Sequence, residues 1–204
     1  MTAPTVVLAS RNQAKVGELQ RILAAARLPV TVVGSDAFAD LGEIPETGET
    51  FAENAAHKAE VVGRHTGLIA VADDSGLCVD ALNGMPGVLS ARWSGSHGND
   101  ETNLRLVIDQ LRDVPDERRT GGFTCAAAAF RPGDVPEMVV RVGEVRGRLL
   151  RAPRGTGGFG YDPIFVPEGE ERTTAEMSPD EKDAISHRGR AFRDLAEAIR
   201  TWFA

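Results

Sequence analysis

Acidic side chains in two parts of the sequence have the residue types needed to hold a hard metal cation. Asp73 and Asp74 directly follow the apolar segment "LIAVA", and Glu46 lies in the loop "DLGEIPETGET" close to Glu43 and Glu49. Carboxylates, water and phosphate oxygens are the usual ligands of Mg²⁺ in proteins. Two adjacent aspartates project in different directions, so at most one of them needs to bind a metal directly. We expect the other to accept hydrogen bonds and hold the loop.

The segment "ASRNQAK" has residues suited to binding phosphate, because it connects a predicted strand to a predicted helix. Ser10 and Asn12 are both good helix caps, and either can begin the helix. Backbone N–H groups at such a turn face an anion, and Lys15 adds a positive charge in the first turn. The alternative is an ordinary capped helix with a surface lysine. Lys58, on a later predicted helix, leaves the same two interpretations open, and the chain has no Walker A sequence.

The segment "RGTGGFGYDPIF" matches the dinucleotide-binding pattern G-x-G-x-x-G, but its context does not. The glycines occupy positions 155, 157 and 160. The pattern requires a helix to begin inside it, whereas Pro163 disfavours helical geometry at Asp162 and strand-like residues follow. Two alternatives remain, a tight loop and a loop that contacts a ligand. In the second, Phe159 and Tyr161 offer flat faces for a base.

A fourth group of polar residues stands in "ISHRGRAF", which predicts the start of the last helix. Ser186 is placed to cap this helix and His187 falls in its first turn. Arg188 carries a planar fork of donors that suits carbonyl and phosphate oxygens. A capped helix with two surface cations is the alternative.

The elements that must position these residues are predicted from apolar periodicity. Strands are expected at 5–9, 30–33, 68–72, 123–130 and 138–145, although the alanine run at 126–129 is also compatible with a helix. Helices are expected after "SRNQAK", from Thr50 to Gly67, from a cap at Asp100, from the capping box of Ser178 and Glu181, and at the C-terminal end. This order predicts an α/β fold with a mixed, elongated sheet flanked by helices. We expect one domain over residues 1–204, with two lobes and a central active-site cleft.

The composition excludes several classes of protein. The formal net charge of −7 argues against binding to polymeric nucleic acid. No apolar run approaches the roughly 18 residues of a membrane span, and the N-terminal segment does not have the pattern of a signal peptide. The two cysteines, Cys78 and Cys125, stand in apolar runs and predict buried thiols, and no cysteine–histidine cluster has zinc spacing. We therefore expect a cytoplasmic enzyme without disulfides.

Taken in order, these segments resemble the inosine triphosphate pyrophosphatase family, which is also described as the dITP/XTP pyrophosphatases, and most of all its bacterial members. The resemblance is carried by "LASRNQAKVGEL", "ETGETFAENAAHKA", "VADDSGLCVDALNGMPGVLSARWSG", "GTGGFGYDPIF" and "MSPDEKDAISHRGRAF", which cover nearly the whole chain. It implies hydrolysis of ITP, dITP and XTP to the monophosphate and pyrophosphate with Mg²⁺. It also implies a homodimer, and a mixed α/β fold with an elongated sheet and a cleft between two lobes.

The resemblance also implies roles for individual residues. Glu46 and Asp74 match the metal-binding carboxylates, and Asp74 also matches the proton acceptor, with Asp73 as its supporting neighbour. The positions matching substrate-binding residues are Ser10, Arg11, Asn12, Gln13, Ala14, Lys15, Lys58, Ser75, Phe159, Gly160, Tyr161, Asp162, Lys182, His187 and Arg188. Many members have threonine at position 10 and a small residue at position 11. Ser10 keeps the hydroxyl, and Arg11 either attracts phosphate or is solvated.

Other functions fit the same residues less well. A non-catalytic nucleotide sensor has no need of both Glu46 and Asp74, and a nicotinamide or flavin oxidoreductase is disfavoured by Pro163. A glycosidase with paired carboxylates would not use the lysines or the glycine-rich loop. Pyrophosphatases acting on dTTP, UTP or modified bases share the chemistry, but "SHRG" and "GGFGYDP" favour the purine branch. The sequence does not identify the element that rejects GTP.

Overall fold

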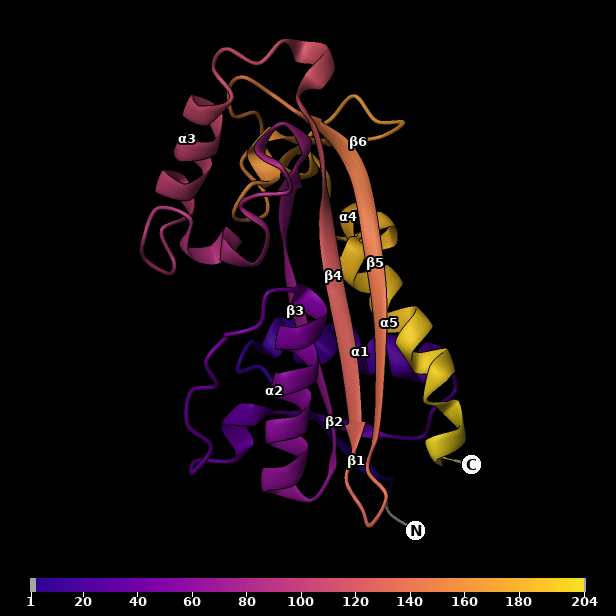
Figure 1. Cartoon of the computed structure of the whole chain (residues 1–204). Helices are drawn as coiled ribbons and strands as arrows, with labels where there is room; N and C mark the ends of the chain where they lie inside the picture. Colours follow the sequence, from indigo (N-terminus) through magenta and orange to yellow (C-terminus); the bar gives the residue numbers. More distant parts are fainter. Residues whose placement is uncertain (1–2, 204) are drawn as a thin grey trace. The chain divides into compact units, whose positions relative to one another are not determined.

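The computed structural model describes residues 3–203, and its six strands form one mixed sheet in the order β2-β1-β3-β4-β5-β6 (Figure 1). The strands are β1 (Thr5–Leu8), β2 (Thr31–Gly34), β3 (Ile69–Val79), β4 (Thr120–Arg131), β5 (Glu137–Leu149) and β6 (Phe165–Pro167). The α-helices are α1 (Gln13–Ala25), α2 (Phe51–Thr66), α3 (Asp100–Gln110), α4 (Pro179–Ile185) and α5 (His187–Ala198). Because β1 is parallel to β2 and β3 while β5 and β6 are antiparallel, the predicted mixed α/β sheet is confirmed.

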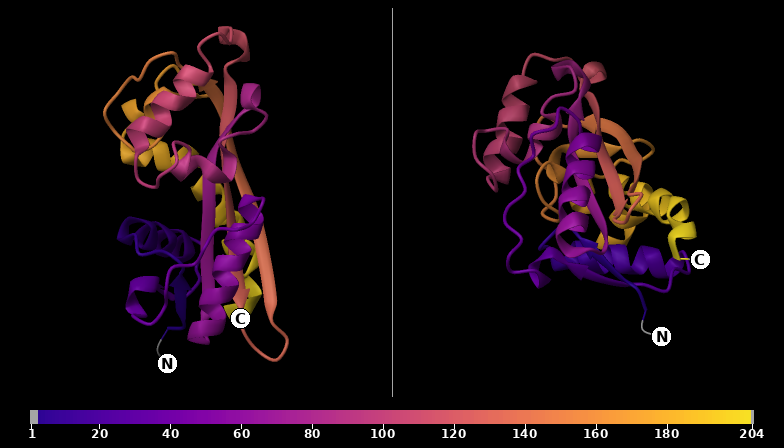
Figure 2. Two further views of the ribbon diagram at one scale, coloured as in Figure 1. Left: turned by 60° about the vertical axis from the view of Figure 1, so that its left-hand side comes forward. Right: turned by 60° about the horizontal axis from the view of Figure 1, so that its bottom comes forward.

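Two compact units make up the chain. Unit 1 contains the residues up to Asp74, residues 125–143 and the residues from Arg188 onward, and unit 2 contains residues 75–124 and 144–187. The boundaries fall inside β3, β4 and β5, so each of these strands contributes residues to both units. Strands β4 and β5 follow each other directly and run side by side (Figures 1 and 2). The single domain with a central cleft stays a prediction.

The core of unit 1 follows from the two-residue alternation of its strands. In β1, Val6 and Leu8 pack in one cluster with residues of α1 and α5, whereas Val7 packs with Val62 of α2. Strand β4 shows the same alternation, since Ala127 lies in the cluster of α1 and α5 and its neighbours face the cluster that contains α2. Small side chains on both faces of β4 let helices approach on each side. The alanine run is therefore a buried strand and not a helix.

The sheet order in unit 1 creates a switch point beside the predicted phosphate segment. After β1 the chain forms α1 and then β2, which pairs with one edge of β1, while β3 pairs with the other edge. In parallel α/β sheets, ligands bind beyond the carboxyl ends of the strands at such a reversal of order. Leu8, the last residue of β1, is opposite Val71, so Ser10 and the two aspartates of β3 follow at this end of the strands.

Unit 2 has its own core, in which Leu77 and Val79 of β3 pack with Leu104 and Val107 of α3 and with Phe165 of β6. Both cysteines carry free thiols, one half-buried (Cys78) and one buried (Cys125). Over the described part of the chain, no helix is long and apolar enough to cross a membrane.

Most predicted helix boundaries are confirmed. Helix α2 begins after Thr50, whose capping box includes Glu53, and it ends at Gly67 in the left-handed conformation. Helix α4 begins with the capping box of Ser178 and Glu181.

Two sequence predictions are wrong in detail. The strand expected at 68–72 continues to Val79, so the aspartates lie within β3 and not in a loop after it. The cause is that β4 pairs along the other edge of β3, which keeps the polar residues in the ladder. Helix α3 is capped by Asn99 and not by Asp100, since the Asn99 side chain accepts a hydrogen bond from Thr102 N.

Candidate functional site

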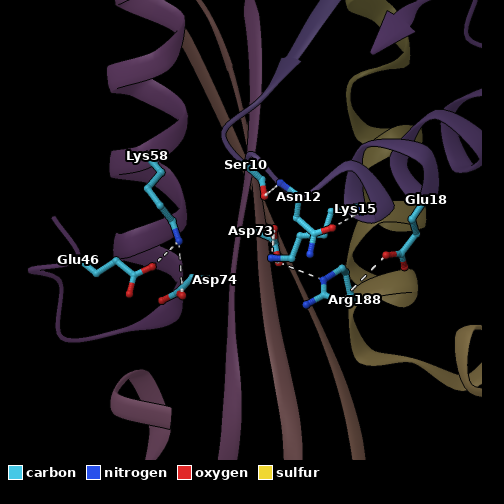
Figure 3. Close-up of polar contacts among 9 residues, drawn as sticks. All are labelled: Ser10, Asn12, Lys15, Glu18, Glu46, Lys58, Asp73, Asp74 and Arg188. Carbon is cyan, nitrogen blue, oxygen red and sulfur yellow. Dashed lines mark hydrogen bonds and ion pairs between the residues drawn. The ribbon is translucent and has the colours of Figure 1, made fainter. Parts of the chain in front are cut away.

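Asp73 and Asp74 are consecutive residues of β3, so their side chains leave the strand on opposite sides (Figure 3). On one side, Lys15 Nζ of α1 donates to both oxygens of Asp73 at 3.0 and 2.9 Å. Arg188 Nε of α5 donates to Asp73 Oδ2 at 3.1 Å, and its Nη1 lies 4.0 Å from Glu18 Oε2. Asp73 therefore joins the first turn of α1 to the first turn of α5.

The charge of Asp73 is fixed by these two cations. Its side chain is only 2% exposed, and burial alone would raise its pKa. The nearby charges of Lys15 and Arg188 outweigh this effect and hold the pKa of Asp73 well below its usual range. Asp73 is thus held in its ionised form between two cations, Lys15 and Arg188. Its expected role as a support of Asp74 stays a prediction.

On the other side of β3, Asp74 faces α2 and the loop before it (Figure 3). Asn54 Nδ2 donates to Asp74 Oδ2 at 3.0 Å. Lys58 Nζ lies 3.5 Å from Asp74 Oδ1 and 2.8 Å from Glu46 Oε1. The two carboxylates predicted to bind metal therefore converge on one ammonium group.

The electrostatics of Asp74 are opposite to those of Asp73. Burial raises the pKa of Asp74 above its usual value, Lys58 opposes the shift, and the like charge of Glu46 adds to it. For Lys58, burial lowers the pKa, but the attraction of Asp74 and Glu46 leaves it raised overall. Asp74 is therefore a buried carboxylate whose proton affinity is increased, which suits a proton acceptor.

The residues at this point fit a hard cation. Glu46 Oε1 and Asp74 Oδ1 both approach the position of the Lys58 ammonium, so the protein already gathers oxygen donors around one positive charge. Among residues 3–203, no group of three or more acidic, histidine or cysteine side chains could hold a metal ion. A magnesium ion bound by these two carboxylates would have to complete its coordination with water and phosphate oxygens, as Mg²⁺ commonly does.

The predicted phosphate turn is formed by the residues between β1 and α1. Asn12, and not Ser10, caps α1: its Oδ1 accepts from Ala14 N at 2.9 Å and from Lys15 N at 3.4 Å. Ser10 Oγ in turn accepts from Asn12 N at 3.2 Å. Two of the N–H groups expected to face an anion are thus occupied by the cap. A phosphate group at this turn would compete with the Asn12 side chain for them.

Arg11 and Gln13 at this turn have partners from the chain after β2. Arg11 Nη2 donates to Leu41 O at 3.3 Å, and Gln13 Nε2 donates to Asp36 Oδ2 at 3.0 Å. Both contacts hold the segment that leads to Glu46. Contact of Arg11, Gln13 and Ala14 with a substrate stays a prediction.

In unit 2, the glycine-rich loop presents an aromatic ring to solvent. Phe159 is 65% exposed, and Lys182 Nζ of α4 lies 4.7 Å from the centre of its ring. The Lys182 ammonium also binds the buried carboxylate of Asp162. Asp162 accepts a further hydrogen bond from Phe159 N at 2.8 Å. An exposed ring beside a fixed cation is a suitable surface for stacking a heteroaromatic base.

Close packing requires three glycines of this loop, Gly155, Gly157 and Gly158. A Cβ atom on Gly158, whose φ is +71°, would lie 2.2 Å from Asp162 Oδ2, and one on Gly155 would lie 2.7 Å from the backbone of Ala175. The loop is followed by a single 3-10 turn at Asp162–Ile164 and then by β6. No α-helix begins within the pattern, which confirms that it is not a dinucleotide fingerprint.

His187 and Arg188 are neighbours in the sequence, but they belong to different units. His187 stacks on Phe123 of β4 within unit 2, with ring centres 5.1 Å apart and an angle of 15° between the rings. Arg188 belongs to unit 1, where it binds Asp73. Base recognition by either residue stays a prediction. Ser75, also expected to bind substrate, is half-buried in β3 directly after Asp74.

Sequence reasoning missed several partners of these residues. They are Glu18 beside Arg188, Asn54 beside Asp74, Asp100, whose carboxylate accepts from Gly160 N at 2.9 Å, and Phe123 against His187. A signal existed for Asn54, because it falls on the apolar stripe of its helix, where an unpaired amide would be costly. The other three depend on contacts between distant segments.

The model of the Ham1 family matches residues 6–198 of this sequence. The chain belongs to the Ham1 family. A protein of Streptomyces coelicolor named dITP/XTP pyrophosphatase is 56% identical over 195 residues, which cover 96% of each chain. The crystal structure of a nucleoside-triphosphatase, dITP/XTP pyrophosphatase, from Mycobacterium abscessus is 52% identical, with a TM-score of 0.80 over 94% of this chain and 98% of that one.

A second solved structure extends the likeness to a more distant sequence. The HAM1 protein of Coxiella burnetii is 40% identical, with a TM-score of 0.89 over 97% of this chain and 99% of that chain. The fold described above is therefore the Ham1 fold.

Proposed function

We propose that this Ham1 protein hydrolyses the non-standard purine nucleoside triphosphates XTP, ITP and dITP to the monophosphate and pyrophosphate. Such an activity would remove these nucleotides before they enter DNA or RNA. The proposal is supported by relatives named dITP/XTP pyrophosphatase that are more than half identical over nearly the whole chain. The structural observation that carries it is the pair of opposed sites on β3, one gathering cations around Asp73 and the other gathering carboxylates around Lys58.

In this proposal, water attacks the α-phosphorus and pyrophosphate leaves. Phosphoryl chemistry of this kind depends mainly on positioning and on neutralising charge. Lys15 and Lys58 supply positive charge to the phosphates, with Lys15 held in place by Asp73. Asp74 accepts the proton of the attacking water, in keeping with its raised pKa. Glu46 and Asp74 would hold Mg²⁺, which supplies charge neutralisation and a polarised water when bound.

Recognition of the base is assigned to Phe159, Gly160, Tyr161, Asp162, Lys182, His187 and Arg188. Hypoxanthine and xanthine carry a 6-keto acceptor where adenine carries an amino donor. A hydrogen-bond donor of the protein therefore pairs with the first two bases and leaves adenine mispaired. A site of this kind can discriminate by about 10⁴–10⁵-fold, or roughly 5–7 kcal/mol. Lys182, which lies beside Phe159, and Arg188, which binds Asp73, are proposed to supply such a donor.

The partners and the location follow from the same proposal. The partner is the nucleoside triphosphate, and the resemblance to the family adds a homodimer, which light scattering of the purified protein tests. A cytoplasmic location is part of the proposal because the nucleotide pool lies there.

The decisive experiment is pyrophosphate release with Mg²⁺ across ITP, XTP, dITP, ATP, GTP and dTTP. We expect kcat/KM for the first three to exceed that for ATP and GTP by at least about 100-fold. Preference for dTTP would move the protein to the pyrimidine branch, and nucleotide binding without turnover would favour a sensor.

A further inference from the structure

Asn54 is a fully enclosed polar side chain next to Asp74. It is 1% exposed and projects from the first half of α2. Its Nδ2 donates to Asp74 Oδ2 at 3.0 Å, and its Oδ1 accepts from Gly48 N at 2.7 Å. One buried amide therefore connects the end of the Glu46 loop to the carboxylate of Asp74.

The two partners explain why the residue is an asparagine. A backbone N–H only donates, and a carboxylate at neutral pH only accepts. An amide satisfies both at once and in one orientation only, because turning it over would set donor against donor and acceptor against acceptor. A carboxylate at position 54 would repel Asp74, and an apolar side chain would leave both groups unpaired.

The contact also selects which oxygen of Asp74 faces the cation. Asn54 and Lys58 lie four residues apart on α2 and so share one face of the helix. Asn54 binds Oδ2, while Lys58 Nζ lies near Oδ1, the oxygen on the side of Glu46. The amide thus holds Asp74 in the orientation in which Oδ1 and Glu46 Oε1 approach the same charge.

On the loop side, the chain fits closely against the amide. A Cβ atom added to Gly48 would lie 2.8 Å from Asn54 Oδ1 and 2.7 Å from Glu53 Cβ. The following residues, Glu49 and Thr50, donate their N–H groups to Glu53 Oε2 at 2.7 and 3.2 Å. The N–H groups of Gly48, Glu49 and Thr50 therefore fix this part of the loop, which begins two residues after Glu46.

We infer that Asn54 is a positioning residue for the two metal-binding carboxylates, Asp74 and Glu46. It holds them in the relative orientation in which both can bind one cation. This inference rests on the proposed function for its meaning, since it takes Asp74 and Glu46 as the magnesium ligands. Outer partners of this kind change metal affinity or activity by roughly 10–100-fold when they are removed.

Three variants separate positioning from simple stability. Asn54→Ala removes the amide, and Gly48→Ala pushes the loop away from it while leaving every polar side chain in place. Thr50→Ala is the matched control, because it removes the cap at the same end of α2 without touching Asp74. All three are expected to lower Tm, and only the first two should alter the metal site.

The readout is the affinity for Mn²⁺ alone, measured without nucleotide from the loss of the free-ion signal in electron paramagnetic resonance. Mn²⁺ favours the same oxygen ligands as Mg²⁺. Asn54→Ala and Gly48→Ala should weaken binding by about tenfold or more, and Thr50→Ala should stay within about twofold of the unchanged protein. In the ITP assay, the first two variants should need more Mg²⁺ for half-maximal rate, with the KM for ITP at saturating Mg²⁺ nearly unchanged.

Equal Mn²⁺ affinity in Asn54→Ala and Thr50→Ala would overturn the inference, and so would the absence of Mn²⁺ binding by the unchanged protein. If Asn54→Ala does not fold, Gly48→Ala decides the question by the same comparison. Failure of the proposed function is recognised separately, as lack of pyrophosphate release from the unchanged protein across the nucleotide panel.

Discussion

The two sides of β3 place the same residue type in opposite environments. Asp73 lies between Lys15 and Arg188, and its pKa is held well below the usual range. Asp74 lies beside Asn54, Lys58 and Glu46, and burial raises its pKa. Consecutive residues of one strand are thus a carboxylate held in its ionised form and a carboxylate whose pKa is raised. The partners supplied by the flanking helices, and not the residue type, therefore set the electrostatics of each aspartate.

The largest effect is expected from Asp74→Asn. The change preserves shape but removes the proposed proton acceptor and a proposed metal ligand, so kcat for ITP should fall by about 10³-fold. The circular dichroism spectrum should stay unchanged, because an amide can still pair with neighbouring groups. Steady-state kinetics checks this, and a variant that keeps a tenth or more of the activity would remove Asp74 from its role.

Asp73→Asn should affect the stability of the fold more than it affects the catalytic rate. The change leaves the partly buried charges of Lys15 and Arg188 without their shared anion, and we expect a loss of about 3 kcal/mol in the free energy of unfolding. Urea denaturation measures this loss. The kcat of the folded fraction should fall less than in Asp74→Asn. Equal kcat losses in the two variants would mean that the two sides of β3 do not differ in role.

Arg188→Ala tests a residue that serves Asp73 and is also proposed to recognise the base. A guanidinium has five N–H donors, so binding Asp73 does not exhaust it. We expect the ratio of kcat/KM for ITP to that for ATP to fall by about tenfold. Competition between the two nucleotides provides the measurement. An equal loss of kcat/KM for both nucleotides would mean that Arg188 supports Asp73 but does not recognise the base.

The smallest effect is expected from Asp80, a partly exposed carboxylate just after β3. Hydrogen bonds from Arg146 and then Thr120 lower its pKa. A lowered pKa gives stability that is present above the pKa of the unfolded chain, near 4, and is lost as the pH falls through the folded value. Since the side chain is 45% exposed, solvent screening should keep the loss in Asp80→Asn below about 0.5 kcal/mol at pH 7.

Thermal unfolding of Asp80→Asn and the unchanged protein at several pH values measures this difference. It should shrink as the pH falls below about 4 and the carboxylate of Asp80 becomes protonated in the unchanged protein as well. A loss in the free energy of unfolding as large as that of Asp73→Asn would contradict this expectation. It would show that burial does not distinguish the ion pairs of Asp73 from that of Asp80.

Much of the fold was predictable because it depends on local patterns. The predicted helix start at Thr50, the capping box at Ser178 and the glycine at position 67 mark three helix boundaries that the structure confirms. The length of β3 was not predictable, since it is set by pairing with β4 and not by the polar residues at its middle. Likewise, Asp100 is a good cap by residue type, but Asn99 takes that place and Asp100 binds Gly160 N.

For the candidate site, the sequence by itself determined which residue types are present and that two adjacent aspartates must point apart. It also disfavoured a dinucleotide fold through Pro163, and its ordered segments resembled the family to which the chain belongs. Only the tertiary structure decided that Lys15 and Arg188 bind Asp73 while Lys58 and Glu46 meet at Asp74. The reason is physical: strand alternation is a local property, but the partner that each side chain meets is chosen by helices packed from distant parts of the chain.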